Sequence, residues 1–158
     1  MLFVLSLDRR RVLDINVTVH PCAGWAAQRV VEAVGFDTSI ARLISDRDGI
    51  YGPRFDARVD HLGVQQIRIA PRAPWQDGHA ERFVGTLRRE LLDRVIVLGE
   101  RHLLRLVKEH TRYYSEDRPR MALDGDAPVS RVLEPPSQGK LVAFPRANGL
   151  DHRCSRAA

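Results

Sequence analysis

Several features that would place the chain in a well-defined class are scarce or missing from its 158 residues. The two cysteines, Cys22 and Cys154, lie near opposite ends without partners at zinc-finger spacing, which argues against a disulfide framework and a structural zinc site. No apolar run approaches the roughly 20 residues of a membrane-spanning helix. The apolar opening, residues 1–7, lacks a preceding basic region and a following cleavage site, so we interpret it as a strand. We expect one cytoplasmic domain with a tail and no membrane association.

Lysine is nearly absent, so the positive charge is carried almost entirely by arginine guanidinium groups. Only Lys108 and Lys140 are lysines, so 23 of the 25 basic residues are arginines, and the formal net charge is +5. Guanidinium groups bind phosphate oxygens in pairs, which favours nucleic acid as the partner. Codon usage in a GC-rich genome is the alternative explanation. The stretch 82–120 holds ten basic and six acidic residues, and codon usage would not concentrate charge in this way.

The hydrophobic periodicity predicts strands that alternate with helices, and therefore a mixed α/β domain. In the first half we expect strands over 2–7 and 12–19, a helix ending at Gly35, a buried strand over 41–44, a short helix ending at Gly63 and a strand over 64–69.

The second half of the chain is predicted to be helical and then irregular. A long helix is expected from Asp77, its N-cap, with apolar residues at steps of four as far as Val95, followed by a helix from about Glu100 to Tyr114. Prolines then become frequent and periodicity is lost. We predict a core over 1–128 and an irregular, basic, proline-containing tail over 129–158 that builds no core.

Two carboxylates occupy positions from which they could converge. Asp46 follows the predicted buried strand, and Glu81 lies in the first turns of the long helix, 35 positions later. Carboxylates that meet repel each other unless a cation lies between them, and hard oxygen ligands favour Mg²⁺ or Mn²⁺. In the alternative interpretation, Asp46 caps a turn and Glu81 pairs with an arginine on a solvated helix face. Asp48 is expected to stabilise a turn rather than bind a metal.

Three segments around and after these carboxylates carry a recognisable pattern. Residues 45–51 read SDRDGIY, residues 74–83 read PWQDGHAERF with LRRE at 87–90, and residues 113–123 read YYSEDRPRMAL with Ala-Pro at 127–128. In this order they resemble the integrase core of retroviral integrases and bacterial insertion-sequence transposases, the DDE group. In the first segment the glycine is displaced by one place, and in the second Asp77 stands where asparagine is commoner.

The resemblance implies a ribonuclease-H-like mixed sheet flanked by helices. It implies that Asp46 and Glu81 are the second and third acids of a triad that holds two Mg²⁺ (or Mn²⁺) ions, and that the protein cuts and joins double-stranded DNA at transposon ends and target. The family's first acid lies on a first strand, whereas residues 2–7 match the second strand, so we expect an N-terminally truncated copy. An active transposase or integrase core that forms homo-oligomers, and a non-catalytic DNA-binding or subunit-pairing remnant, both remain open.

Three arginines of the long helix are the predicted DNA contacts. Arg88 follows Glu81 by seven positions on the same helix face, and Arg82 and Arg89 form a neighbouring pair with the same spacing. We expect them to contact phosphates without reading base sequence. The alternative is that the arginines form intrahelical ion pairs, such as Arg89 with Asp93 or Arg105 with Glu109.

Overall fold

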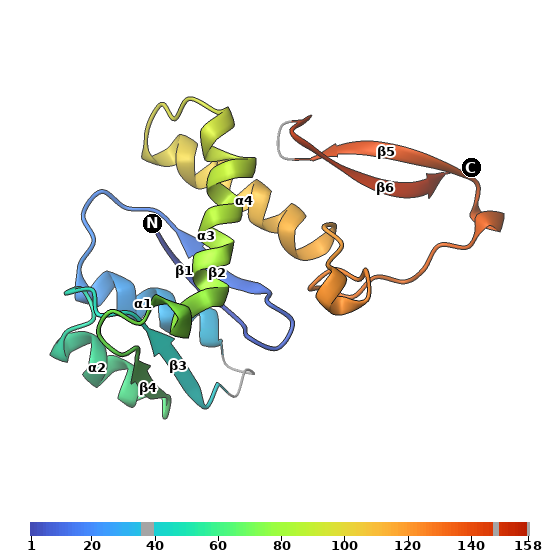
Figure 1. Ribbon diagram of the computed structural model, residues 1–158. Helices are drawn as coiled ribbons and strands as arrows, with labels where there is room; N and C mark the ends of the chain where they lie inside the picture. The colour runs from blue at the N-terminus through green and yellow to red at the C-terminus, as the bar shows by residue number, and fades with distance from the viewer. Residues whose placement is uncertain (36–39, 147–148, 158) are drawn as a thin grey trace. The chain divides into compact units, whose positions relative to one another are not determined.

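The structure is a computed structural model that describes residues 1–35, 40–146 and 149–157. The chain divides into two compact units, of which the first comprises residues 1–5 and 13–85 and the second residues 6–12 and 86–158. Four α-helices and three two-stranded sheets account for the regular structure described (Figure 1). The expected mixed α/β fold is therefore observed. None of the helices in the described ranges is long and apolar enough to cross a membrane.

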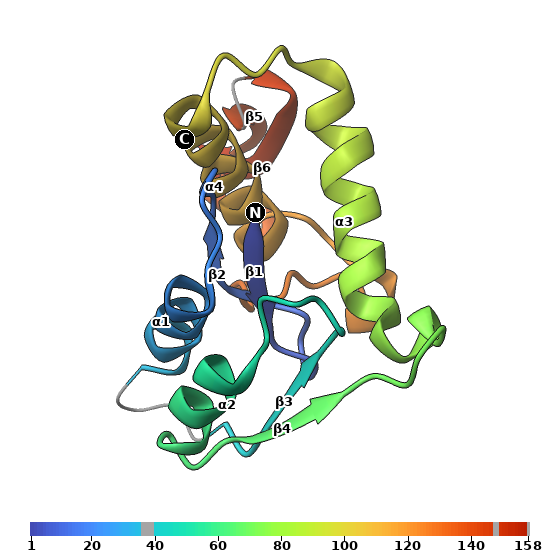
Figure 2. The same cartoon turned by 90° about the vertical axis from the view of Figure 1, so that its left-hand side faces the viewer.

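The first unit contains two small sheets and two helices that pack on them. Its elements are β1 (Leu2–Leu5), β2 (Val12–Asn16), α1 (Ala23–Val34), β3 (Arg42–Ser45), α2 (Pro53–Asp60) and β4 (Gln65–Arg68). β1 pairs with β2, and β3 runs parallel to β4 in a register from Arg42 opposite Gln65 to Ser45 opposite Arg68. Figure 2 shows the two parallel strands side by side with α2 nearby, and α2 contacts β4.

The core of this unit follows the helical spacing seen in the sequence. Phe55 and Val59, four positions apart on α2, are completely buried, and so is Ala26 of α1. Such spacing places side chains on one face of a helix. The remaining buried members of the core cluster are Leu2, Val4, Ala27, Val30, Val34 and Val64. The helix that was expected to end at Gly35 does so, and Gly35 adopts the positive φ of 60° that glycine tolerates.

The strand expected to be buried over residues 41–44 is largely exposed, which corrects that prediction. Leu43 packs against the core cluster, whereas Ile44 is 38% exposed. Successive side chains of a strand point to opposite faces, so the core covers only one of these two neighbours. A short apolar run therefore identified the strand but not its burial.

The long helix ends earlier than the sequence suggested. η1 (Pro74–Asp77) runs directly into α3 (Gly78–Glu90), and a further 3-10 turn, η2 (Leu92–Arg94), follows. Asp77 therefore closes a 3-10 turn instead of standing outside the helix as its N-cap. Phe83, Leu87 and Leu91 are buried as the four-residue spacing predicts. Helical geometry stops at Leu91, with φ −122° and ψ −64°, so Val95 lies outside the helix.

α4 (Glu100–Glu116) confirms the second predicted helix, and short 3-10 turns η3 (Met121–Leu123) and η4 (Pro136–Gln138) follow it.

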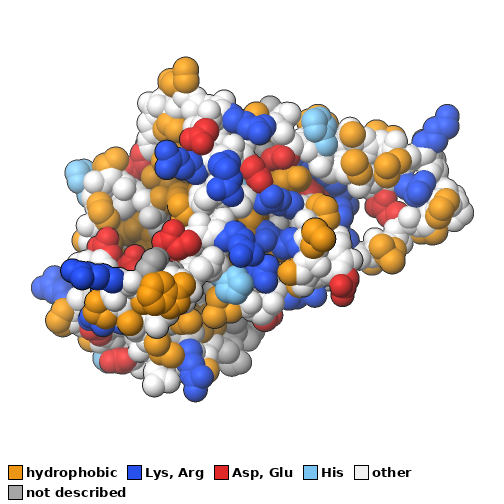
Figure 3. All heavy atoms as spheres, viewed as in Figure 1, with side chains coloured by type: hydrophobic (Ala, Val, Ile, Leu, Met, Phe, Trp, Pro, Cys, Tyr) orange, Lys and Arg blue, Asp and Glu red, His pale blue; other side chains and the backbone are white. Residues whose placement is uncertain are grey.

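The tail is not irregular throughout, which corrects the prediction for residues 129–158. β5 (Lys140–Arg146) and β6 (Asp151–Ala157) form an antiparallel pair in which Pro145 lies opposite His152. Both strands of a two-stranded ribbon are edge strands, and an edge strand tolerates a proline that cannot donate a hydrogen bond. Hydrophobic side chains are exposed along this hairpin (Figure 3), and Leu141 and Phe144 are 65% and 44% exposed. The prolines of the tail therefore did not exclude strands.

Candidate functional site

The parallel pair β3 and β4 determines where Asp46 lies. The ladder continues one step beyond the strands, because the Ile69 N–H donates to the Ser45 carbonyl at 3.0 Å. Asp46 follows immediately after Ser45. Parallel strands end at the same edge of their sheet, so the chain leaving β4 toward α3 starts from the edge at which Asp46 stands. This is the edge at which α/β sheets commonly bind ligands.

The turn after β3 is built by its own carboxylates. Asp46 Oδ1 accepts a hydrogen bond from the Asp48 N–H at 3.0 Å, and Asp48 Oδ1 accepts one from the Ile50 N–H at 2.9 Å. Side chains of this type stabilise turns by bonding to the backbone two residues ahead. The expected structural role of Asp48 is observed. Asp46 also caps the turn, while its Oδ2 makes no hydrogen bond within the described part of the chain.

Two side chains hold the loop after β4 at this edge. Arg47 Nε donates to the Ile69 carbonyl at 2.8 Å, and Gln76 Oε1 accepts from the Ala70 N–H at 2.7 Å. The loop therefore stays near the turn that carries Asp46 before it enters η1. α3 begins directly afterwards and presents Glu81, an exposed residue, in its first turn.

Asp77 connects the two predicted acids electrostatically. Partial burial, followed by the negative charges of Asp46 and Glu81, raises the pKa of the Asp77 carboxyl above its ordinary value. Both predicted acids therefore lie within electrostatic range of this third carboxylate. Sequence reasoning assigned Asp77 to helix capping and missed this position. Its signal was the four-residue spacing to Glu81, which brings two like charges onto one helix face.

Tyr51 belongs to the same region of negative potential. Burial and then the charges of Asp46, Asp48 and Asp77 raise the pKa of its phenol to about 12. The ring packs edge-on against Phe55 with centroids 4.8 Å apart. The turn after β3 is therefore anchored to the core by the same residue that borders the carboxylates.

The donor set suits a hard divalent cation, although it is not a complete cage. In residues 1–35, 40–146 and 149–157, no group of three or more His, Cys, Asp or Glu residues is placed to hold a metal ion. Mg²⁺ is commonly bound by one or two carboxylates together with water and substrate phosphates. Asp46 and Glu81 are carboxylates of the kind that take part in that mode of binding.

The predicted DNA-contacting arginines differ in their surroundings. Arg88 Nε lies 3.6 Å from Asp93 Oδ1, and the two side chains are 75% and 56% exposed. Asp93 therefore pairs with Arg88 and not with Arg89 as the alternative interpretation proposed. So exposed an ion pair contributes little and is easily exchanged for another anion. Arg82 and Arg89 are exposed and form no ion pair with any described residue.

Other basic residues of the same stretch have structural partners. Arg118 Nη2 bonds to Glu90 Oε1 at 2.6 Å, and the Arg120 guanidinium lies 3.8 Å from the centre of the Tyr114 ring. These contacts fix the segment after α4. Some basic residues of the stretch 82–120 therefore have a structural role, whereas others are available to an external anion such as DNA.

Comparison with known proteins gives one family match. Residues 62–128 match the family model described as Integrase core domain. The matched segment includes Glu81 and the three predicted DNA-contacting arginines, while Asp46 lies before it. No curated protein matches the chain.

Proposed function

We propose, from the match of residues 62–128 to the integrase core domain model, that the chain is the catalytic core of a transposase or integrase that cleaves DNA phosphodiester bonds and transfers strands. The observation that carries this proposal is the placement of Asp46 after β3, at the sheet edge from which the chain leaves β4 toward α3 and Glu81. It supports a common site for one carboxylate at a sheet edge and another in the first turn of a helix. The substrate would be double-stranded DNA.

Asp46 and Glu81 are the residues that would hold Mg²⁺ or Mn²⁺. When bound, such an ion polarises the scissile phosphate and helps to activate the attacking hydroxyl. Asp46 Oδ1 already accepts a hydrogen bond from the Asp48 N–H, and the rest of the carboxylate would be available to the ion. Asp77 would add negative potential that attracts the cation. Its raised pKa reflects partial burial and then repulsion from Asp46 and Glu81, and a cation would relieve that repulsion.

Arg82, Arg88 and Arg89 would bind the phosphates that flank the reacting bond. Arg88 would exchange its exposed contact with Asp93 for a DNA phosphate. Such contacts hold DNA in position without reading bases and depend on salt. In this proposal the protein is cytoplasmic, associated with the nucleoid, and forms homo-oligomers.

A second candidate function is a non-catalytic DNA-binding or subunit-pairing fragment of a transposase. The observation that favours it is that the described residues place no three metal-binding side chains together. The two functions differ in whether the chain performs chemistry on the DNA that it binds.

Nicking of supercoiled plasmid in the presence of Mn²⁺ tests the proposal. We expect nicking by the unaltered chain and its loss in Glu81→Gln and Asp46→Asn. Asp60→Asn, which removes an exposed carboxylate from α2, is the control and should nick normally. Nicking that Glu81→Gln leaves unchanged would remove Glu81 from the mechanism. Duplex binding without nicking in any divalent metal would support the non-catalytic function.

A further inference from the structure

α4 carries a row of cations along its exposed face. The row consists of Arg101, Arg105, Lys108 and Arg112, which follow one another at steps of four, three and four residues. This spacing keeps side chains on one face of a helix. All four side chains are exposed, whereas the opposite face is buried and includes Leu106, Val107, His110 and Tyr114.

Most of this charge has no acidic partner among the residues that the structure describes. Arg112 Nε bonds to Glu116 Oε2 at 3.0 Å, which accounts for one of the four cations. Glu109 lies four positions after Arg105 and could pair with it, yet no ion pair joins them in the described structure. Arg101 and Lys108 likewise have no acidic partner among the described residues. Three neighbouring cations are therefore available to an external anion.

The surface lacks the features that a protein partner would require. No large hydrophobic side chain of α4 is substantially exposed. Stable protein interfaces have an apolar, desolvated centre in which charged residues are depleted. A row of cations without such a centre instead fits a polyanion that remains hydrated at its edges.

The length of the row fits a nucleic acid backbone. Lys108 follows Arg101 by seven positions, which corresponds to about 10 Å along a helix axis. Each strand of a DNA duplex presents one phosphate per about 3.4 Å of its axis, so the three available cations span the rise of about three base pairs. Several phosphates can therefore be reached by one face of α4.

We propose that the exposed face of α4 is a second DNA-binding surface, on which Arg101, Arg105 and Lys108 contact backbone phosphates of duplex DNA. The choice of DNA as the polyanion rests on the proposed function. The contact itself requires neither a metal nor the carboxylates at the start of α3. This surface grips DNA without base specificity and adds to the phosphate contacts of α3.

The test compares two variants of the full chain that lose the same charge. The first is Arg101→Gln/Arg105→Gln/Lys108→Gln. The control is Arg11→Gln/Arg54→Gln/Arg58→Gln, which alters exposed arginines elsewhere. Binding of a fluorescent duplex is measured by anisotropy in EDTA over a range of salt concentrations. Each lost phosphate contact reduces the magnitude of the slope of log affinity against log salt concentration by about 0.9. This magnitude should therefore fall by about 2 to 3 in the α4 variant.

Several outcomes would overturn the assignment. Equal slopes and affinities for the α4 variant and the control would exclude α4 as a contact surface. Binding of a polyglutamate peptide as tightly as duplex DNA would exclude DNA as the preferred partner. Glu81→Gln should bind duplex DNA with the same salt dependence as the unaltered chain. A defect in catalysis can therefore be distinguished from a defect in the α4 surface. Thermal melting of both triple variants checks that they fold, as expected for exposed positions.

Discussion

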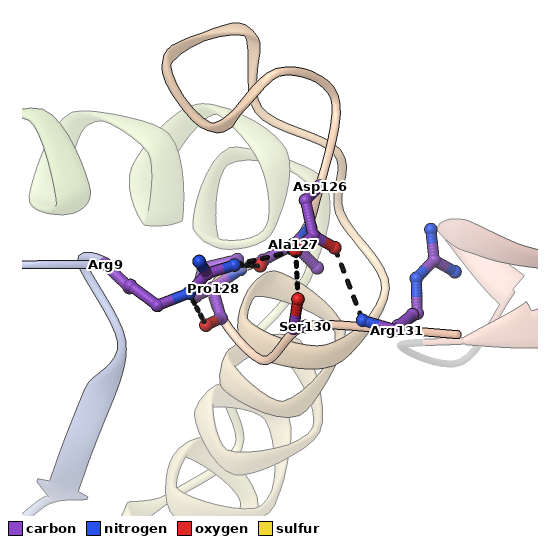
Figure 4. Close-up of polar contacts among 6 residues, drawn as sticks. All are labelled: Arg9, Asp126, Ala127, Pro128, Ser130 and Arg131. Atoms are coloured by element: carbon purple, nitrogen blue, oxygen red, sulfur yellow. Dashed lines mark hydrogen bonds and ion pairs between the residues drawn. The ribbon is translucent and has the colours of Figure 1, made fainter. Parts of the chain in front are cut away.

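Arg9 and Asp126, which are 117 positions apart, form an ion pair with 2.7 Å between Arg9 Nη2 and Asp126 Oδ2. The same guanidinium donates from Nε to the Pro128 carbonyl at 2.8 Å and from Nη2 to the Ala127 carbonyl at 2.9 Å (Figure 4). One arginine from the turn after β1 therefore holds the segment 126–128 in place. This arginine has a structural role although composition alone would count it among the cations available to DNA.

Asp126 is expected to make stability depend on pH in acid. The Ser130 hydroxyl, the Ala127 and Arg131 N–H groups and Arg9 lower the pKa of this carboxyl to about 2. An acid with a depressed pKa stabilises the folded protein fully above its unfolded value near 3.8, and this stabilisation is lost as the pH falls toward 2. Asp126→Asn should therefore melt at a lower temperature at pH 6, and the difference should narrow in acid. A constant difference would contradict the pKa shift.

Asp77→Asn is expected to stabilise the protein at neutral pH. The pKa of Asp77 is raised, so its ionised form costs stability above the folded pKa, and this cost disappears as the pH falls to the unfolded value of 3.8. Denaturant titrations should give a higher free energy of unfolding for Asp77→Asn than for the unaltered chain at pH 7, and equal values near pH 3. Adding Mg²⁺ at pH 7 should stabilise the unaltered chain more than the variant. An equal response to Mg²⁺ would argue against a cation near Asp77.

His110 is expected to destabilise the fold in mild acid. It is fully buried, both ring nitrogens lack a hydrogen-bond partner among the described residues, and Nδ1 lies 3.8 Å from Asp151 Oδ2. Burial lowers the pKa of the imidazole; Asp151 opposes this shift, whereas Arg118 adds to it. A base with a lowered pKa loses folding stability as the pH falls below its unfolded value of 6.5.

The variant His110→Leu should remove that component of the pH dependence. Melting temperatures from pH 8 to pH 5 should fall less steeply in His110→Leu than in the unaltered chain. Parallel curves would show that the imidazole does not titrate on unfolding.

Phe55→Ala should strongly destabilise the first unit. The Phe55 side chain is completely buried and packs against Tyr51. Deleting a buried aromatic side chain typically costs about 3–5 kcal/mol because a cavity remains. Leu62→Ala is the control: Leu62 is 37% exposed, and its truncation should cost about 1 kcal/mol or less. Comparable losses in the two variants would contradict the core described above. Urea denaturation measures both values.

The local pattern of the sequence was sufficient for most helices and strands. The spacing of Phe55 and Val59, or of Phe83 and Leu87, is a property of neighbours along the chain, and these residues are buried as predicted. The integrase resemblance also lay in short contiguous segments, and the second and third of these fall entirely within the matched residues 62–128. The positions of Asp46 and Glu81 relative to their own elements were therefore predictable.

Contacts between distant segments could not be predicted in the same way. Pro145 indicated an irregular tail, but it lies opposite His152 in a two-stranded ribbon, where an edge strand tolerates a proline. Asp77 was expected to cap a helix, and only the folded chain brings it within range of the Asp46 charge.

The sequence by itself determined the alternation of strands and helices, the basic character of residues 82–120 and the two acids of the candidate site, because each depends on residues close together in the chain. Only the tertiary structure decided which arginines are available to DNA. Arg9 is bound by Asp126 and Arg118 by Glu90, whereas Arg105 forms no ion pair with any described residue despite a suitably spaced Glu109. The physical reason is that an ion pair forms where folding brings opposite charges within a few ångströms, and the order of residues does not specify that distance.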